Sequence, residues 1–207
     1  MIVIVDNGMG NIKSVENASV FLGKKVKVSS SPSDIKKAKK IIFPGVGHFE
    51  KAMLELKRRR LLNVLKGTIK DGVPFFGICL GMQLLLDKSQ EAPGIKGLGV
   101  IKGEVKKFKL KGLIVPHMGW NQISFNKIED NTEEDTLLNK VKNDSFFYFA
   151  HSYYCVPEDK RIITTITNYG IDFVSSFRSK NVWAVQFHPE KSQKLGLKVF
   201  NNFLNLA

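Results

Sequence analysis

The stretch Val73-Pro74-Phe75-Phe76-Gly77-Ile78-Cys79-Leu80-Gly81-Met82-Gln83 decides the fold class. Residues 73–78 are apolar on both faces, as buried parallel strands are, and residues 80–86 are typical of a helix. Cys79 falls on the turn between them with a glycine two positions away on either side, so strand and helix can pack closely while the thiol stands clear. The pattern is the cysteine counterpart of a nucleophile elbow. The alternative is a buried structural cysteine, because free cysteine is among the most buried residue types.

Strand-like and helix-like runs alternate on the N-terminal side of this stretch. Residues 2–5, 25–28 and 41–43 predict short strands, while residues 12–22 and 49–70 predict amphipathic helices, the second of them broken. Such alternation is typical of a parallel sheet covered by helices.

The chain changes character after residue 99, where extended segments follow one another without long helices. The expected strands are 100–110, 145–150, 161–167, 172–178 and 182–187. Residues 195–203 predict a closing amphipathic helix, and the polar, acidic residues 126–135 predict a surface loop. We therefore expect one α/β domain over residues 1–207, with a mixed sheet that is antiparallel in its C-terminal part.

Composition narrows the class of protein further. Two cysteines in 207 residues do not indicate a disulfide framework, and the longest apolar runs are far shorter than the ~20 residues that span a bilayer. The strand-like opening MIVIVD does not resemble a signal peptide, so a cytoplasmic location is expected.

The net charge of +13 suggests a nucleic-acid-binding protein as one alternative. The basic runs at 36–40, 57–60 and 102–111 carry no RNA-binding signature, however, and lie outside the motifs that carry chemistry. We expect solvated faces there, which could steer association with an acidic partner.

A second motif, Gln186-Phe187-His188-Pro189-Glu190, follows the last expected strand. Residues i and i+2 of an extended segment point to the same side, so His188 and Glu190 can meet, and Pro189 keeps His188 out of a helix. A histidine oriented by a carboxylate is the base that activates a cysteine. Cys79 and His188 are 109 positions apart. Cys79 supplies a nucleophile and His188 the base that activates it, so together they favour cysteine-based catalysis over a structural role.

The third motif is the glycine-rich loop Pro44-Gly45-Val46-Gly47, which follows an expected parallel strand. Ligands bind at the carboxyl ends of such strands, so this loop and Cys79 should share one site, where loop N–H groups could stabilise an oxyanion. The loop lacks the GK[ST] ending of a phosphate cradle, which argues against nucleotide binding. His48, His117, His151 and Cys155 have no metal-ligand spacing, so neither metal nor cofactor is expected, and Cys155 is expected in the core.

These motifs together resemble the class I, triad-type glutamine amidotransferases, and the likeness runs along essentially the whole chain. Several segments are similar, more narrowly, to the HisH family, the glutaminase subunits of imidazole glycerol phosphate synthase. They are IVDNGMGNIKSV (4–15), FPGVGHF (43–49), IVPHMGWN (114–121), YFAHSYY (148–154) and FHPEKS (187–192). The resemblance implies a three-layer, flavodoxin-like fold with a mainly parallel central sheet.

The resemblance also implies roles for individual residues. Cys79 would attack the side-chain carboxamide of glutamine, His188 would carry protons, and Glu190 would orient His188. The N–H of Leu80, with that of Val46 or Gly47, would form the oxyanion hole. The residues expected to hold glutamine are Gln83, Glu91, His151, Ser152 and Tyr153.

A partner follows from the same resemblance. Ammonia would pass to a HisF-like (β/α)₈ cyclase that makes imidazole glycerol phosphate and an aminoimidazole carboxamide ribotide in histidine biosynthesis. The residues expected near that docking face are Asn11, Met118, Trp120, Asn121 and Lys191. Asn7 stands where family members commonly have Tyr, which leaves open a paralogue that serves another synthase, for example in surface-sugar amination. A stand-alone cysteine hydrolase or peptidase is a further alternative.

Overall fold

The central sheet is parallel in the half that carries Cys79. The computed structural model describes residues 1–9, 11–126 and 136–206. Five strands lie side by side and parallel, in the order β2 (Val26–Ser29), β1 (Ile2–Val5), β3 (Lys40–Gly45), β4 (Phe75–Cys79) and β12 (Val182–Val185).

Antiparallel strands continue the sheet beyond β12. They are β11 (Asp172–Ser179), β10 (Ile163–Asn168), β7 (His117–Phe125) and β8 (Ser145–His151). Off this path, β9 (Tyr153–Pro157) pairs with β11 and with β6 (Gly103–Lys107), and β6 pairs with the short β5 (Lys88–Ser89). The expected α/β fold with a mixed sheet is confirmed.

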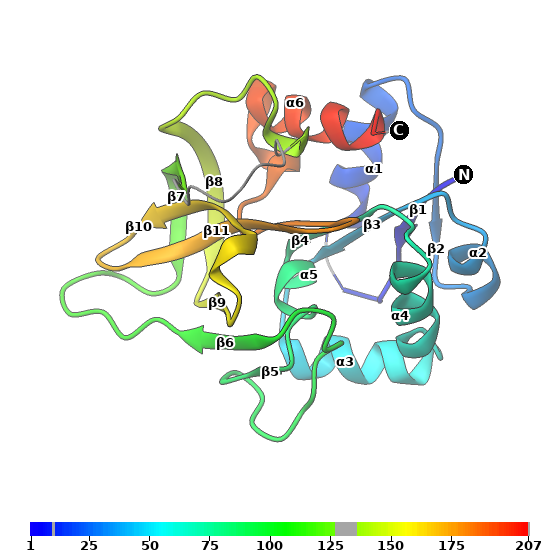
Figure 1. The fold of residues 1–207 in the computed structure, drawn as a ribbon, viewed down its shortest axis with the longest axis horizontal. Coiled ribbons are helices and arrows are strands. Elements are labelled where there is room, and N and C mark those ends of the chain that lie inside the picture. The colour runs from blue at the N-terminus through cyan, green and yellow to red at the C-terminus, as the bar shows by residue number, and fades with distance from the viewer. Residues whose placement is uncertain (10, 127–135, 207) are drawn as a thin grey trace.

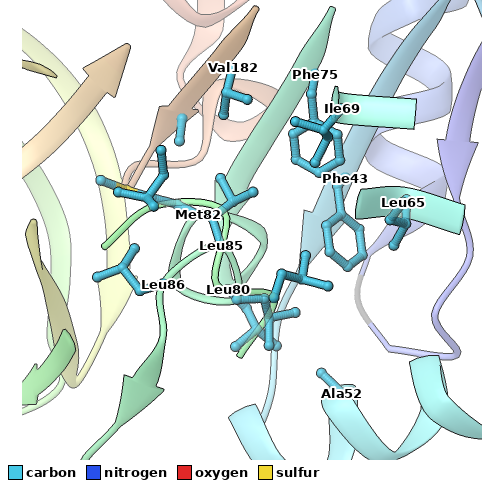
Figure 2. Close-up of a cluster of buried hydrophobic side chains, with 14 of the residues drawn as sticks. Phe43, Ala52, Leu65, Ile69, Phe75, Leu80, Met82, Leu85, Leu86 and Val182 are labelled. Carbon is cyan, nitrogen blue, oxygen red and sulfur yellow. The ribbon is translucent and has the colours of Figure 1, made fainter. Parts of the chain in front are cut away.

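Helices cover both faces of the parallel half, and Figure 1 shows α1 (Ile12–Phe21) and α6 (Gln193–Leu204) on the side opposite α3 (Phe49–Arg58) and α5 (Leu80–Gln83). The side chains of consecutive strand residues point to opposite faces of the sheet. Apolar residues in succession therefore give each face a core that helices can cover, which makes three layers. Ile42 and Phe76 pack with α1 and α6, while Phe43 and Phe75 pack with α3, α5, α2 (Pro32–Lys36) and α4 (Leu62–Lys70). Figure 2 shows the second core, where the rings of Phe43 and Phe75 meet edge to face with centroids 5.9 Å apart.

The expected break in residues 49–70 is confirmed. Arg60 adopts a left-handed φ of 58°, and the N–H of Leu61 donates to the carbonyl of Leu56 while that of Arg60 donates to Lys57. This is the hydrogen-bonding pattern of a Schellman cap, which ends α3 before α4 begins.

The helix after Cys79 is shorter than expected, ending at Gln83 instead of residue 86. The carbonyls of Leu84, Leu85 and Leu86 accept backbone N–H groups from the segment 98–101, so they are turned away from a helical continuation. The same bonds shorten the strand expected over 100–110, because Val100 and Ile101 donate to Leu85 and only Gly103–Lys107 form β6.

Sequence reasoning missed the strands β5, β7 and β9 and extended others by a few residues. Residues 160–162 form a 3-10 turn before β10, and β12 ends at Val185, not at residue 187. Met118 and Trp120 lie on β7 and are 64% and 47% exposed. Most of the acidic loop expected at 126–135 lies outside the described residues.

Solvated faces were expected for the basic runs, but some of their residues make internal contacts. Lys40 is partly buried and donates to the carbonyls of Phe203, Leu204 and Leu206 at the end of α6. Arg59 pairs with Asp6 and Glu55. None of the helices in the described part of the chain has the length and apolar character to cross a membrane.

Candidate active site

Cys79 lies on a tight turn between β4 and α5, with φ 53° and ψ −107°. Such a backbone is rare for a residue with a side chain and indicates strain held in place by the surrounding structure. The flanking glycines make the turn possible. A Cβ on Gly81 would come within 1.9 Å of the carbonyl oxygen of Phe43, and one on Gly77 within 2.9 Å of the carbonyl oxygen of Gly81.

Three neighbouring parallel strands bring the sequence motifs together. Gly45 at the end of β3 lies beside Cys79 at the end of β4, and Val185 at the end of β12 lies beside Ile78. The PGVG loop, Cys79 and the segment 186–190 therefore emerge at the same edge of the sheet, the edge at which open α/β sheets bind ligands.

His188 and Glu190 form a buried pair, with His188 Nδ1 2.7 Å from Glu190 Oε1. The backbone differs from the expected extended segment, since His188 is extended but Pro189–Lys191 form a 3-10 turn. His188 is fixed at both backbone ends, because its N–H donates to the carbonyl of Tyr148 and its carbonyl accepts the hydroxyl of Ser192. The opposite ring atom, Nε2, is buried, and it has no hydrogen-bond partner among the described residues.

The electrostatics of His188 favour the protonated ring. Burial lowers its pKa, but the charge of the Cys79 thiolate and the bond to Glu190 outweigh burial and raise the pKa to about 10. The site therefore favours an imidazolium beside Cys79.

A pocket of about 200 Å³ opens at Cys79. The residues expected from the sequence to form the oxyanion hole or to hold glutamine all line it, and Pro116, Met118 and Ala150 complete the wall. The expected residues are Val46, Gly47, Leu80, Gln83, Glu91, His151, Ser152 and Tyr153. Gly47 has φ +110°, and no backbone acceptor for its N–H lies in the described ranges.

Glu91 and Gln83 are held in the wall by the protein itself. One carboxylate oxygen of Glu91, Oε2, accepts the N–H of Phe49 at the start of α3, at 2.8 Å. Gln83 Nε2 donates to the carbonyl of Tyr153 and to Gln186 Oε1, at 3.0 and 3.1 Å. Burial and the charge of Glu91 raise the pKa of the Tyr153 hydroxyl.

Two neutral histidines extend this network toward β7. His151 Nδ1 lies 2.8 Å from the carbonyl of Tyr153, and His151 Nε2 lies 3.2 Å from His117 Nδ1. His117 Nε2 in turn lies 3.2 Å from the Asn121 amide. Burial lowers the pKa of His117 to about 4 and that of His151 to about 3. Within the described part of the chain, no group of three or more His, Cys, Asp or Glu could hold a metal ion.

The residues expected at a docking face do not all lie on one surface cluster. Trp120 packs edge to face on Tyr148, and Lys191 lies over the same Tyr148 ring at 5.6 Å. Met118 is exposed on β7 and also lines the pocket. Asn121 instead turns inward to His117.

Asn11 caps the N-terminus of α1, accepting the N–H of Ser14. Cys155, expected in the core, is fully buried on β9, where burial raises the pKa of its thiol. It does not line the pocket.

Sequence reasoning missed Gln186. Its side chain is fully buried, and its Nε2 donates to Cys79 Sγ at 3.5 Å. The signal was present, because the two-residue spacing that pairs His188 with Glu190 also places Gln186 on that side of an extended segment.

Comparisons with known proteins place the chain in a family. Residues 3–206 match the family model described as Glutamine amidotransferase class-I. The chain is 46% identical to Imidazole glycerol phosphate synthase subunit HisH 1 of Methanococcus maripaludis, over 100% of both chains. It is 44% identical to the chloroplastic Imidazole glycerol phosphate synthase hisHF of Arabidopsis thaliana, over 99% of this chain but 34% of that one.

A crystal structure of a glutamine amidotransferase has a similar fold, with a TM-score of 0.74 at 18% identity, covering 99% of this chain and 97% of that one. The chain belongs to the class I glutamine amidotransferase family and, within it, to the HisH subunits of imidazole glycerol phosphate synthase.

Proposed function

We propose that the chain hydrolyses L-glutamine to glutamate and ammonia through a thioester on Cys79, with His188 and Glu190 completing the triad. The observation that carries the proposal is the juxtaposition of the three residues. Cys79 opens into a small pocket, and the buried His188–Glu190 pair that interacts with it comes from the adjacent strand end.

The chemistry follows from where the proton is held. With the proton on His188, the sulfur of Cys79 is the nucleophile, and it adds to the side-chain carboxamide carbon of glutamine. The negative charge that develops on the carboxamide oxygen would be met by the N–H groups of Leu80 and of Val46 or Gly47. His188 then gives its proton to the departing nitrogen, releasing ammonia. Water attacks the thioester with His188 as base, which regenerates Cys79 and releases glutamate.

The pocket suits a small amino acid. Its volume of about 200 Å³ is below the range of ~300–1,000 Å³ that is usual for drug-sized ligands. Glu91 Oε1 is not engaged by the Phe49 N–H that holds Oε2, so this carboxylate can meet the α-ammonium group of glutamine.

The ammonia would be delivered to a HisF-type cyclase in histidine biosynthesis. The Arabidopsis relative supports this partner, since its name joins hisH and hisF and the likeness covers only 34% of its length. Met118, which lines the pocket, and Trp120, two residues further along β7, are exposed and support docking on this side, because apolar and aromatic residues are enriched at the centres of interfaces.

The test is a glutaminase assay on the full chain co-purified with a HisF-type cyclase, with and without the acceptor ligand. Cys79→Ser is expected to abolish glutamate release while leaving folding and co-purification intact. The matched control is Cys155→Ser, which changes a buried cysteine outside the pocket and should keep the activity. Glutamate release by Cys79→Ser at the wild-type rate would show that Cys79 is not the nucleophile.

The same assay separates the alternatives. A glutaminase subunit should release more ammonia when the cyclase and its ligand are added, whereas a stand-alone peptidase should respond to neither. A nucleic-acid-binding protein would instead show binding to nucleic acid that falls steeply with salt.

A further inference from the structure

Gln186 is a buried carboxamide that the triad does not use. It follows β12 directly, is 0% exposed, and lies between Cys79 and Gln83. A fully buried amide is costly unless its polar atoms are satisfied, so its hydrogen bonds hold it in one orientation.

The orientation of Gln186 follows from a backbone carbonyl. The carbonyl of Tyr153 can only accept a hydrogen bond, so Gln83 must present its NH₂ group there. The second N–H of that group then points to Gln186, which must accept it with its carbonyl oxygen, Oε1. The NH₂ group of Gln186 is consequently the part that faces Cys79 Sγ, at 3.5 Å.

A donor aimed at sulfur acts differently on the two forms of cysteine. A thiolate is a strong acceptor and gains from a neutral N–H, while a thiol is a weak acceptor and gains little. Because the donor belongs to an amide that does not titrate, it is present at every pH at which the protein is folded. It also restrains Sγ on a turn whose backbone is strained.

We propose that Gln186 is a positioning residue for the nucleophile: anchored through Gln83 to the carbonyl of Tyr153, it donates to Cys79 Sγ and holds the thiolate toward the pocket. The inference rests on the proposed glutaminase function only for the kinetic part of its test, since alkylation of Cys79 needs no glutamine.

Two substitutions separate a donor to sulfur from a simple structural anchor. Gln186→Met fills a similar volume but removes both the donor and the acceptor. Gln186→Glu keeps the acceptor for Gln83 and replaces the donor at sulfur by a carboxylate oxygen. An anchoring role alone predicts that Gln186→Glu resembles the wild type. The proposal predicts instead that Gln186→Glu lowers the reactivity of Cys79 more than Gln186→Met does.

The measurements are the rate of alkylation of the full chain by iodoacetamide at pH 7, and kcat and KM for glutamine in the complex with a cyclase. Gln186→Met is expected to lower the alkylation rate and kcat about tenfold with KM within about twofold, as the loss of a hydrogen bond to a charged group would. Gln186→Glu should lower both rates further. In alkylation, Gln122→Met, an exposed glutamine on β7, is the matched control and should behave as wild type.

Wild-type alkylation and kcat in Gln186→Met, with the thermal unfolding midpoint unchanged, would overturn the proposal. So would a Gln186→Glu variant as reactive as wild type. If the complex hydrolyses no glutamine, the proposed function fails, and the alkylation rates still decide the role of Gln186.

Discussion

The wild-type protein is expected to lose stability between pH 7 and pH 5, in part because of His117. Replacing His117 by glutamine should make that loss about 2 kcal/mol smaller. His117 is 3% exposed and stacks on Phe149 and Tyr169. Its two ring nitrogens contact His151 and Asn121. A glutamine at this position can donate to one neighbour and accept from the other, as the neutral imidazole does.

The magnitude comes from the difference in proton binding between the folded and unfolded chains. Burial lowers the pKa of His117 from 6.5 to about 4 in the folded state. At pH 5 the unfolded chain therefore carries a proton that the folded chain does not, so stability falls as the pH falls through 6.5 toward 4. Integration from pH 7 to pH 5 gives about 2 kcal/mol for this histidine.

His151 contributes in the same direction, because burial lowers its pKa to about 3, and it does so in both the wild type and the variant. Other titrating groups are also common to the two proteins. The difference between the two pH dependences consequently reports His117 together with the small part of the His151 shift that the charge of His117 causes, which acts in the same direction.

The assay is urea unfolding at pH 7, 6 and 5, with midpoints and slopes fitted for the wild type and His117→Gln. The His117 ring of the folded protein should also titrate near pH 4 by NMR. Equal pH dependence in the two proteins, or a ring that titrates above pH 6, would refute the reasoning.

Three further predictions concern folding and assembly. Gly81→Ala should prevent soluble folding, because its Cβ would meet the Phe43 carbonyl at 1.9 Å; Gly67→Ala in α4, with nothing within 4 Å, should raise stability by up to about 1 kcal/mol. Soluble yield and melting temperature measure both, and a normally folded Gly81→Ala would contradict the elbow packing. Lys40→Met should cost about 2 kcal/mol in urea unfolding, since the last carbonyls of α6 lose a cation; an unchanged midpoint would count against this cap. Trp120→Ala should weaken cyclase binding about thirtyfold by calorimetry without altering the melting temperature, and unchanged affinity would remove it from the interface.

The parallel half of the fold could be predicted from the sequence because its signals are local. The run 73–78 is apolar on both faces and is followed by glycines and a cysteine, and this pattern requires a buried strand and a tight turn wherever the rest of the chain lies. The break between α3 and α4 is likewise a matter of a few neighbouring residues.

The antiparallel half was less predictable, because its elements depend on distant partners. β7 pairs with β8 and β10, and nothing within 117–125 alone distinguishes this strand from a loop. The helix after Cys79 stops early because the segment 98–101 takes the carbonyls that a longer helix would need.

The candidate site likewise combines features that the sequence determines with features that only the tertiary structure decides. The identities and spacing of Cys79, His188 and Glu190 are properties of the chain itself, since the elbow and the histidine–carboxylate pair are each built from adjacent residues. Only the tertiary structure brought Gln186 within reach of the sulfur and joined His117 to His151, because these contacts cross between strands far apart in sequence. Burial, which comes from packing and not from local pattern, then kept His117 and His151 neutral, whereas at His188 the neighbouring Cys79 and Glu190 outweigh burial.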